Sequence, residues 1–176
     1  MVEAIVLFSK SSSLVPAWTR SDKAWLHSFL MGISMIAVSI GFAVIFYNKD
    51  MAGKPHFTTW HGLLGLITLC FCGAQSSGGA LIKYYRYVGS YVKIRLADLK
   101  LYHATAGLCA SLLITVTLLL SLFSTWAVSN IHWLLWYVCA GCVSASALVI
   151  MTHITGAYMP SPGQNSGSIS GQPGQS

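Results

Sequence analysis

Charge is scarce in this chain of 176 residues, because only 8% of them are Asp, Glu, Lys or Arg. Ordinary soluble domains carry roughly 25% charged residues. Hydrophobic residues make up 55% of the chain, and its mean hydropathy is +0.64. Such a composition cannot cover a water-facing surface, which excludes an ordinary soluble domain. Lipid is therefore the expected solvent for most of the chain, and the bilayer its first expected partner.

Several patterns that would indicate other functions are also missing. The five cysteines are an odd number, all fall within apolar runs, and have neither the spacing of a zinc site nor a disulfide framework. No nucleophile triad or phosphate-binding loop is visible. The net charge of +6 comes from basic residues between apolar runs, not from a basic stripe with aromatics. Nucleic acid is therefore not an expected partner, and membrane topology explains the charge more simply.

Four long apolar runs fill most of the chain, at residues 25–47, 57–82, 99–123 and 131–157. Each exceeds the ~20 residues that a helix needs to cross the hydrocarbon core of a bilayer. Within these runs, Lys, Arg, Asp and Glu occur only near the ends, if at all. The predicted fold class is all-α, an integral membrane bundle of four transmembrane helices.

The basic residues between the runs predict the orientation. Eight lie on one side, in residues 1–24 and in the loop between the second and third runs, and only Lys49 and Lys54 lie on the other. Basic loops stay in the cytoplasm, so both termini are predicted to be cytoplasmic. We expect a cytoplasmic N-terminal segment at 1–21, a transmembrane domain at 22–158 and a disordered, Gly/Ser/Gln/Pro-rich cytoplasmic tail at 159–176.

Histidines are the candidates for chemistry inside the membrane, where ionisable side chains are usually functional. His27 and His103 lie near the cytoplasmic ends of the first and third runs, which cross the membrane in the same direction. Their side chains are therefore expected at similar depth, as needed to hold one haem iron from opposite sides. His61 lies near the outer end of the second run, too far away to share that iron. The alternative is that each is only a polar residue at the membrane interface.

Glycine follows two of these histidines by four residues, as Gly65 after His61 and Gly107 after His103. Positions four apart share a helix face, so each glycine is expected to leave room for a flat macrocycle. Gly32, five residues after His27, is a poorer match. Zinc or copper is less favoured, because the runs lack internal carboxylates and histidine pairs four residues apart. An iron with two imidazole ligands has no open position, which favours the transfer of single electrons.

Basic residues precede both cytoplasmic histidines. Arg20 and Lys23 come before His27, and Arg95 and Lys100 come before His103. Four cations near one haem edge would attract an anionic reductant. The alternative is that they only set the topology, since the same residues serve both purposes.

Three segments resemble the cytochrome b561 family, closest to its short domain-containing branch of transmembrane ascorbate-dependent reductases. They are residues 60–66 (WHGLLGL), 75–79 (QSSGG) and 99–107 (LKLYHATAG). The resemblance implies a six-helix bundle with two b haems, held by four histidines on four consecutive helices. It also implies a reaction in which cytoplasmic ascorbate reduces monodehydroascorbate or ferric chelates across the membrane.

Carried over to this chain, the family pattern gives His27 and His103 to the cytoplasmic haem and His61 to the outer haem. Lys100 best fits the family's ascorbate site, and Lys23, Arg20 and Arg95 match more loosely. The family pattern implies two further helices before these, which we do not find in this sequence, and with them the expected partner of His61. His56 or His132 could replace that partner, or a second chain could supply it, as in a homodimer.

Other readings remain open on the sequence alone. The chain could be a truncated, haem-poor interaction protein that pairs with full-length relatives, or less plausibly a small transporter or scaffold with four spans. The membrane could be an endomembrane, of the endoplasmic reticulum or a vesicle, or the plasma membrane.

Overall fold

The structure is a computed structural model that describes residues 17–158, with side chains as far as residue 152. Residues 1–16 of the predicted N-terminal segment 1–21, and the whole predicted tail 159–176, lie outside the described residues. Six helices and no strands make up the described part of the chain: α2 (Arg20–Met51), α3 (Trp60–Lys83), α4 (Tyr85–Val88), α5 (Leu96–Leu122), α6 (Thr125–Asn130) and α7 (Trp133–Tyr158).

The four long helices can each span a membrane. The apolar spans of α2, α3, α5 and α7 contain 32, 24, 27 and 20 residues. At 1.5 Å per residue, 20 residues reach about 30 Å, the thickness of the hydrocarbon core. This confirms the prediction of an all-α membrane bundle with four transmembrane helices. The short helices α4 and α6 lie in the connections and were not predicted.

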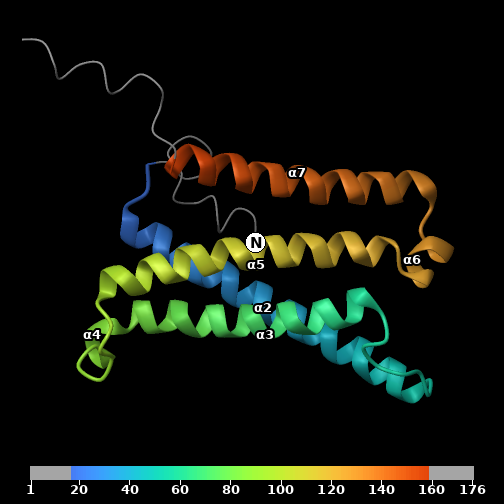
Figure 1. The fold of residues 1–176 in the computed structure, drawn as a ribbon, viewed down its shortest axis with the longest axis horizontal. Helices are drawn as coiled ribbons and strands as arrows, with labels where there is room; N and C mark the ends of the chain where they lie inside the picture. Colours follow the sequence, from blue (N-terminus) through green and yellow to red (C-terminus); the bar gives the residue numbers. More distant parts are fainter. Residues whose placement is uncertain (1–16, 159–176) are drawn as a thin grey trace, which may run out of the picture.

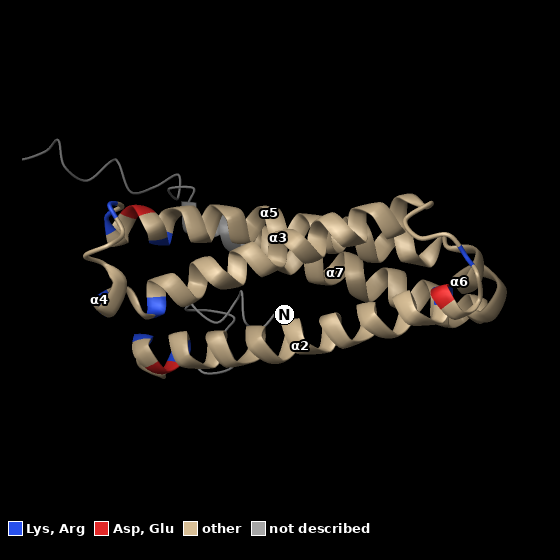
Figure 2. Cartoon of the chain, turned by 90° about the horizontal axis from the view of Figure 1, so that it is seen from below, with Lys and Arg blue, Asp and Glu red and all other residues tan. Residues whose placement is uncertain are grey.

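The long helices alternate in direction (Figure 1). Helices α2 and α5 begin at the end of the bundle where α3 finishes, which we call the α4 end; α3 and α7 begin at the opposite end, the α6 end. Helix α3 packs against α5, α5 against α7, and α2 against α3. The Lys, Arg, Asp and Glu residues of the described part lie toward the two ends of the bundle, and its middle has none (Figure 2).

Small side chains form the contact between α3 and α5. Thr68 and Cys72 on α3 are buried, as are Ala110, Ser111 and Thr117 on α5. Small residues let two helices approach closely, which drives packing where lipid is as apolar as the helix surface. Many large apolar side chains are exposed instead, since they face lipid and not a protein core.

The start of α3 is fixed by a capping threonine. The Thr59 hydroxyl accepts a hydrogen bond from the Gly62 amide at 3.1 Å. Phe57, just before the cap, has a positive φ of 55°. This turn places His61 in the first turn of α3, at the α6 end.

Candidate functional site

Two of the predicted histidines come together at the α4 end. The ring centroids of His27 on α2 and His103 on α5 lie 6.4 Å apart, with their planes at 84°. Both rings are half-buried. An imidazole nitrogen binds a transition metal at roughly 2 Å, so two imidazoles on opposite sides of one ion have centroids about 6 Å apart. The observed separation fits that arrangement.

The His103 ring lies against two consecutive glycines of α3. A Cβ atom at Gly79 would be 3.1 Å from His103 Cε1 and 3.5 Å from Nε2, and one at Gly78 would be 3.8 Å from Nδ1. The Cβ at Gly79 would push against the ring, whereas the one at Gly78 would make an ordinary contact with it. Glycine therefore clears the place that the ring occupies, and the two positions form a ledge on α3.

The His103 ring is also unsatisfied as a hydrogen-bonding group. Its Nδ1 atom is buried and has no hydrogen-bond partner in the described part of the chain. Leaving a buried polar atom unpaired costs roughly 1–3 kcal/mol, so such an atom is rare and calls for an explanation. The unpaired nitrogen, the glycine ledge and the distance to His27 together fit a haem held between two imidazoles.

No group of three or more His, Cys, Asp or Glu is placed to hold a metal ion by itself among residues 17–152, whose side chains the structure describes. A haem needs only two axial ligands from the protein, because its macrocycle supplies the others. The pair of His27 and His103 is therefore a sufficient protein donor set for that cofactor.

We had expected Gly65 and Gly107 to leave open space beside the histidines, and this prediction is wrong. A Cβ at Gly107 would lie 3.1 Å from Gln75 Nε2, and one at Gly65 would lie 3.6 Å from the Thr117 methyl group. In both cases a side chain from the neighbouring helix occupies the position. Of the three glycines weighed beside the histidines, Gly32, the poorer match, is the one where a Cβ would meet no described atom within 4 Å. The glycines beside the His103 ring are Gly78 and Gly79, whose role the spacing did not predict.

His61 lies at the α6 end, in the contact between α3 and α5. Its Nδ1 atom is 3.0 Å from the carbonyl oxygen of Thr117. A carbonyl oxygen only accepts, so Nδ1 carries the hydrogen and Nε2 keeps its lone pair. Gly79, beside His103, comes 18 residues after His61 in the same helix, which corresponds to about 27 Å along its axis. His61 cannot share an ion with His103.

The two proposed substitutes for the partner of His61 have other contacts. The His56 ring stacks on Phe46 with centroids 4.0 Å apart, and its Nε2 is 3.8 Å from an Asp50 oxygen. His132 is exposed beside Trp133. Neither ring contacts His61 in the part of the chain that the structure describes. The structure thus brings two histidine rings together at the α4 end, and none of the described rings lies against His61 at the α6 end.

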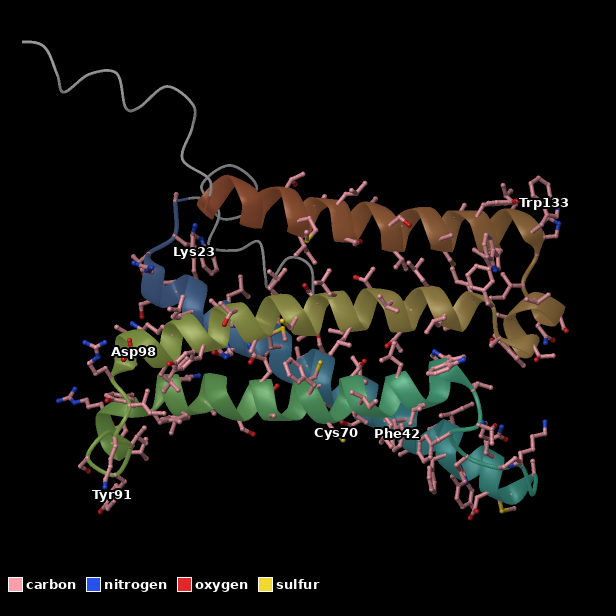
Figure 3. The ribbon with its side chains drawn as sticks, viewed as in Figure 1. Lys23, Phe42, Cys70, Tyr91, Asp98 and Trp133 are labelled. Carbon is pink, nitrogen blue, oxygen red and sulfur yellow. The ribbon has the colours of Figure 1, made fainter. Side chains whose placement is uncertain are left out.

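The four predicted cations all lie at the α4 end, but their environments differ. Arg95 binds both carboxylate oxygens of Asp98, at 2.8 and 3.2 Å. Lys23 is only 8% exposed, whereas Arg20 and Lys100 are exposed. Figure 3 shows Lys23 and Asp98 at the same end of the bundle, far from Trp133. Lys100 is therefore the exposed cation nearest in sequence to His103 and has no carboxylate partner within the described range.

The chain is similar to known proteins over most of its length. Residues 1–128 match the family model described as eukaryotic cytochrome b561. The chain is 35% identical over 159 residues to the transmembrane reductase CYB561D2 of Bos taurus, covering 90% of this chain and 70% of the bovine protein. It is 36% identical over 160 residues to the probable transmembrane reductase CYB561D1 of Mus musculus, covering 91% of this chain and 69% of the mouse protein. No solved structure matches the chain.

Proposed function

Since this chain belongs to the eukaryotic cytochrome b561 family, we propose that it uses ascorbate on one side of the membrane to reduce monodehydroascorbate or a ferric chelate on the other. The family binds haem b, and the named relatives are transmembrane reductases. The chain is accordingly a multi-pass membrane protein and an oxidoreductase that transfers electrons. The substrates, the ligands and the orientation belong to the proposal.

His27 and His103 are the proposed axial ligands of one b haem at the α4 end. The observation that carries this assignment is the 6.4 Å separation of their rings, which come from two helices running in the same direction. The ledge of Gly78 and Gly79 supports it, because it holds the His103 ring clear of larger side chains. When bound, a haem with two imidazole ligands accepts and releases one electron without an open site for oxygen.

Ascorbate is proposed to approach the α4 end. Ascorbate is an anion near neutral pH, and exposed Lys100 would attract it together with Arg20 and the more buried Lys23. Arg95 contributes less, because Asp98 already neutralises it. Loss of one electron and one proton from the ascorbate monoanion gives monodehydroascorbate. The same electron reduces a ferric chelate to its ferrous form, or, with a proton, monodehydroascorbate to ascorbate.

The α4 end is proposed to face the cytoplasm, with both termini there. The excess of Lys and Arg around this end supports that orientation. At the α6 end, His61 is the proposed ligand of an outer haem, with Nε2 as its coordinating atom. Its partner would come from His56 or His132 after a change of contacts, or from a second chain in a homodimer. The membrane would be an endomembrane or the plasma membrane.

The spectrum of the purified protein tests the proposal. The full chain is expressed in membranes with haem supplied, and reduced-minus-oxidised difference spectra are recorded. Sharp low-spin b-type bands that ascorbate elicits are the expected result, and the haem-to-protein ratio tells whether one or two haems are bound. A folded protein without haem would contradict the proposal and favour the alternative of a haem-poor interaction protein that pairs with longer relatives.

A further inference from the structure

We infer that Gln75 is a positioning residue for His103, which holds the turn of α5 that carries this proposed haem ligand. The inference rests on the proposed function, because it assigns a role to Gln75 in the same haem site. It also gives a function to the segment QSSGG at residues 75–79, which the assignment of ligands leaves without one.

The contact is made between a side chain and the main chain. The amide nitrogen of Gln75 on α3 donates a hydrogen bond to the carbonyl oxygen of His103 on α5. In an α-helix this carbonyl also accepts from the amide four residues later, at Gly107. A Cβ at Gly107 would lie 3.1 Å from the Gln75 nitrogen. The absence of a side chain at position 107 therefore lets the side-chain amide of Gln75 reach the carbonyl oxygen of His103.

Gln75 and the glycine ledge share one face of α3. Gly78 and Gly79 follow Gln75 by three and four residues, and such positions lie on the same side of a helix, one turn apart. This face thus meets His103 at two points: Gln75 binds its carbonyl, and the glycines lie against its ring. Two points of attachment fix the rotation of α5 about its axis, and with it the direction in which the ring faces His27.

Two positions of α3 close to Gln75, Gly73 and Ser77, take no part in the contact with His103. Ser77 is exposed and donates its hydroxyl to the Gly73 carbonyl within α3. A Cβ at Gly73 would meet no atom within 4 Å among the described residues. Substitutions at these two positions therefore change the same helix without changing its contact with His103, and they serve as matched controls.

Four single variants of the full-length protein test the inference: Gln75→Leu and Gly107→Ala disturb the contact, and Ser77→Ala and Gly73→Ala do not. Haem is titrated into each purified protein, and the g values of the low-spin ferric signal are measured by electron paramagnetic resonance. Partners that orient metal ligands typically contribute about 10–100-fold to affinity, so we expect Gln75→Leu and Gly107→Ala to weaken haem binding by about tenfold. Their g values are expected to shift, because these depend on the orientation of the axial rings.

The double variant Gln75→Leu/Gly107→Ala gives a further check. Both substitutions break the same contact, so their effects should not add. A purely structural role would lower the yield of folded protein but leave the g values of the folded fraction unchanged, and that result would overturn the inference. Wild-type affinity and g values in Gln75→Leu would overturn it as well. If Gln75→Leu does not fold, Gly107→Ala alone decides, since it keeps the glutamine. Wild-type protein that binds no haem would instead refute the proposed function, and the inference with it.

Discussion

Thr68 on α3 and Thr117 on α5 join their hydroxyl groups at 3.0 Å in the buried contact between the two helices. Thr68 also donates to the Leu64 carbonyl at 2.7 Å, so the Thr117 hydroxyl is the donor to Thr68. The Thr117 carbonyl in turn accepts from His61. A short chain of polar contacts therefore holds α5 in register with α3 beside the proposed outer ligand.

A double-mutant cycle measures this contact. Replacing Thr68 and Thr117 by valine, singly and together, should give a coupling of about 0.6 kcal/mol, the average for interhelical hydrogen bonds in membranes. Reversible unfolding in detergent micelles supplies the free energies. Thr115→Val is the control, because the Thr115 hydroxyl bonds only to the Ser111 carbonyl within α5. Additive effects of the two valine substitutions would show that the hydroxyl groups do not interact.

Substitution of either proposed ligand, His27 or His103, should remove the haem at the α4 end. We expect His27→Ala and His103→Ala each to abolish the low-spin b-type spectrum of that haem, because a single imidazole leaves one axial position without its protein ligand. Difference spectroscopy at equal protein concentration measures the loss. The exposed Ser77→Ala, on α3 at the same end of the bundle, is the control and should keep the spectrum. Full haem content in His27→Ala or His103→Ala would refute the assignment of these ligands.

His61→Ala then separates one haem from two. If the outer site binds a second haem, this variant should lose about half of the absorbance and keep the other half, since His61 lies about 27 Å along α3 from Gly79, the residue beside the His103 ring. If only the α4 end binds haem, the spectrum should be unchanged. Loss of the entire spectrum would contradict the independence of the two ends.

A side chain added at Gly79 should disturb the His103 ring and weaken haem binding. Gly79→Ala places a Cβ 3.1 Å from the His103 ring, so the ring or the helix must shift by a few tenths of an ångström. We expect haem affinity to fall by about tenfold, the lower end of the range for groups that orient a metal ligand. Haem titration measures the effect, with Gly73→Ala as the control in the same helix. Equal affinities in the two variants would show that the ledge does not constrain the ring.

The membrane fold could be predicted from the sequence because it depends on simple quantities. Four apolar runs long enough to span lipid predict four helices, and the ends of the helices differ from the predicted ends by at most five residues, as at the start of α2 (Arg20–Met51). The pairing of His27 with His103 followed from two helices that cross in the same direction. The helices α4 and α6 were missed, because they are short and lie in connections where no periodicity is visible.

The surroundings of the histidines could not be predicted in the same way. The spacing of Gly107 after His103 shows that both lie on one face of α5, but not which side chain of another helix meets that face. That depends on the rotation of α5 about its axis, and a helix that is apolar on every side gives no signal for it. The amide of Gln75 occupies the position that we expected to be open. The contact of Gly78 and Gly79 with the His103 ring could not be predicted for the same reason, since these glycines belong to the neighbouring helix.

The positive charge of Lys100 at the α4 end should lower the KM for ascorbate. Lys100 is exposed and lies three residues before His103, whereas Lys54 is exposed in the connection at the α6 end. One charge about 4 Å from an anion in water contributes about 1 kcal/mol, so Lys100→Gln should raise the KM for ascorbate by about fivefold with little change in kcat. The difference should shrink at high salt, because mobile ions screen exposed charges. Lys54→Gln removes the same charge at the other end and should leave this KM unchanged; the reverse result would place the ascorbate site at the α6 end.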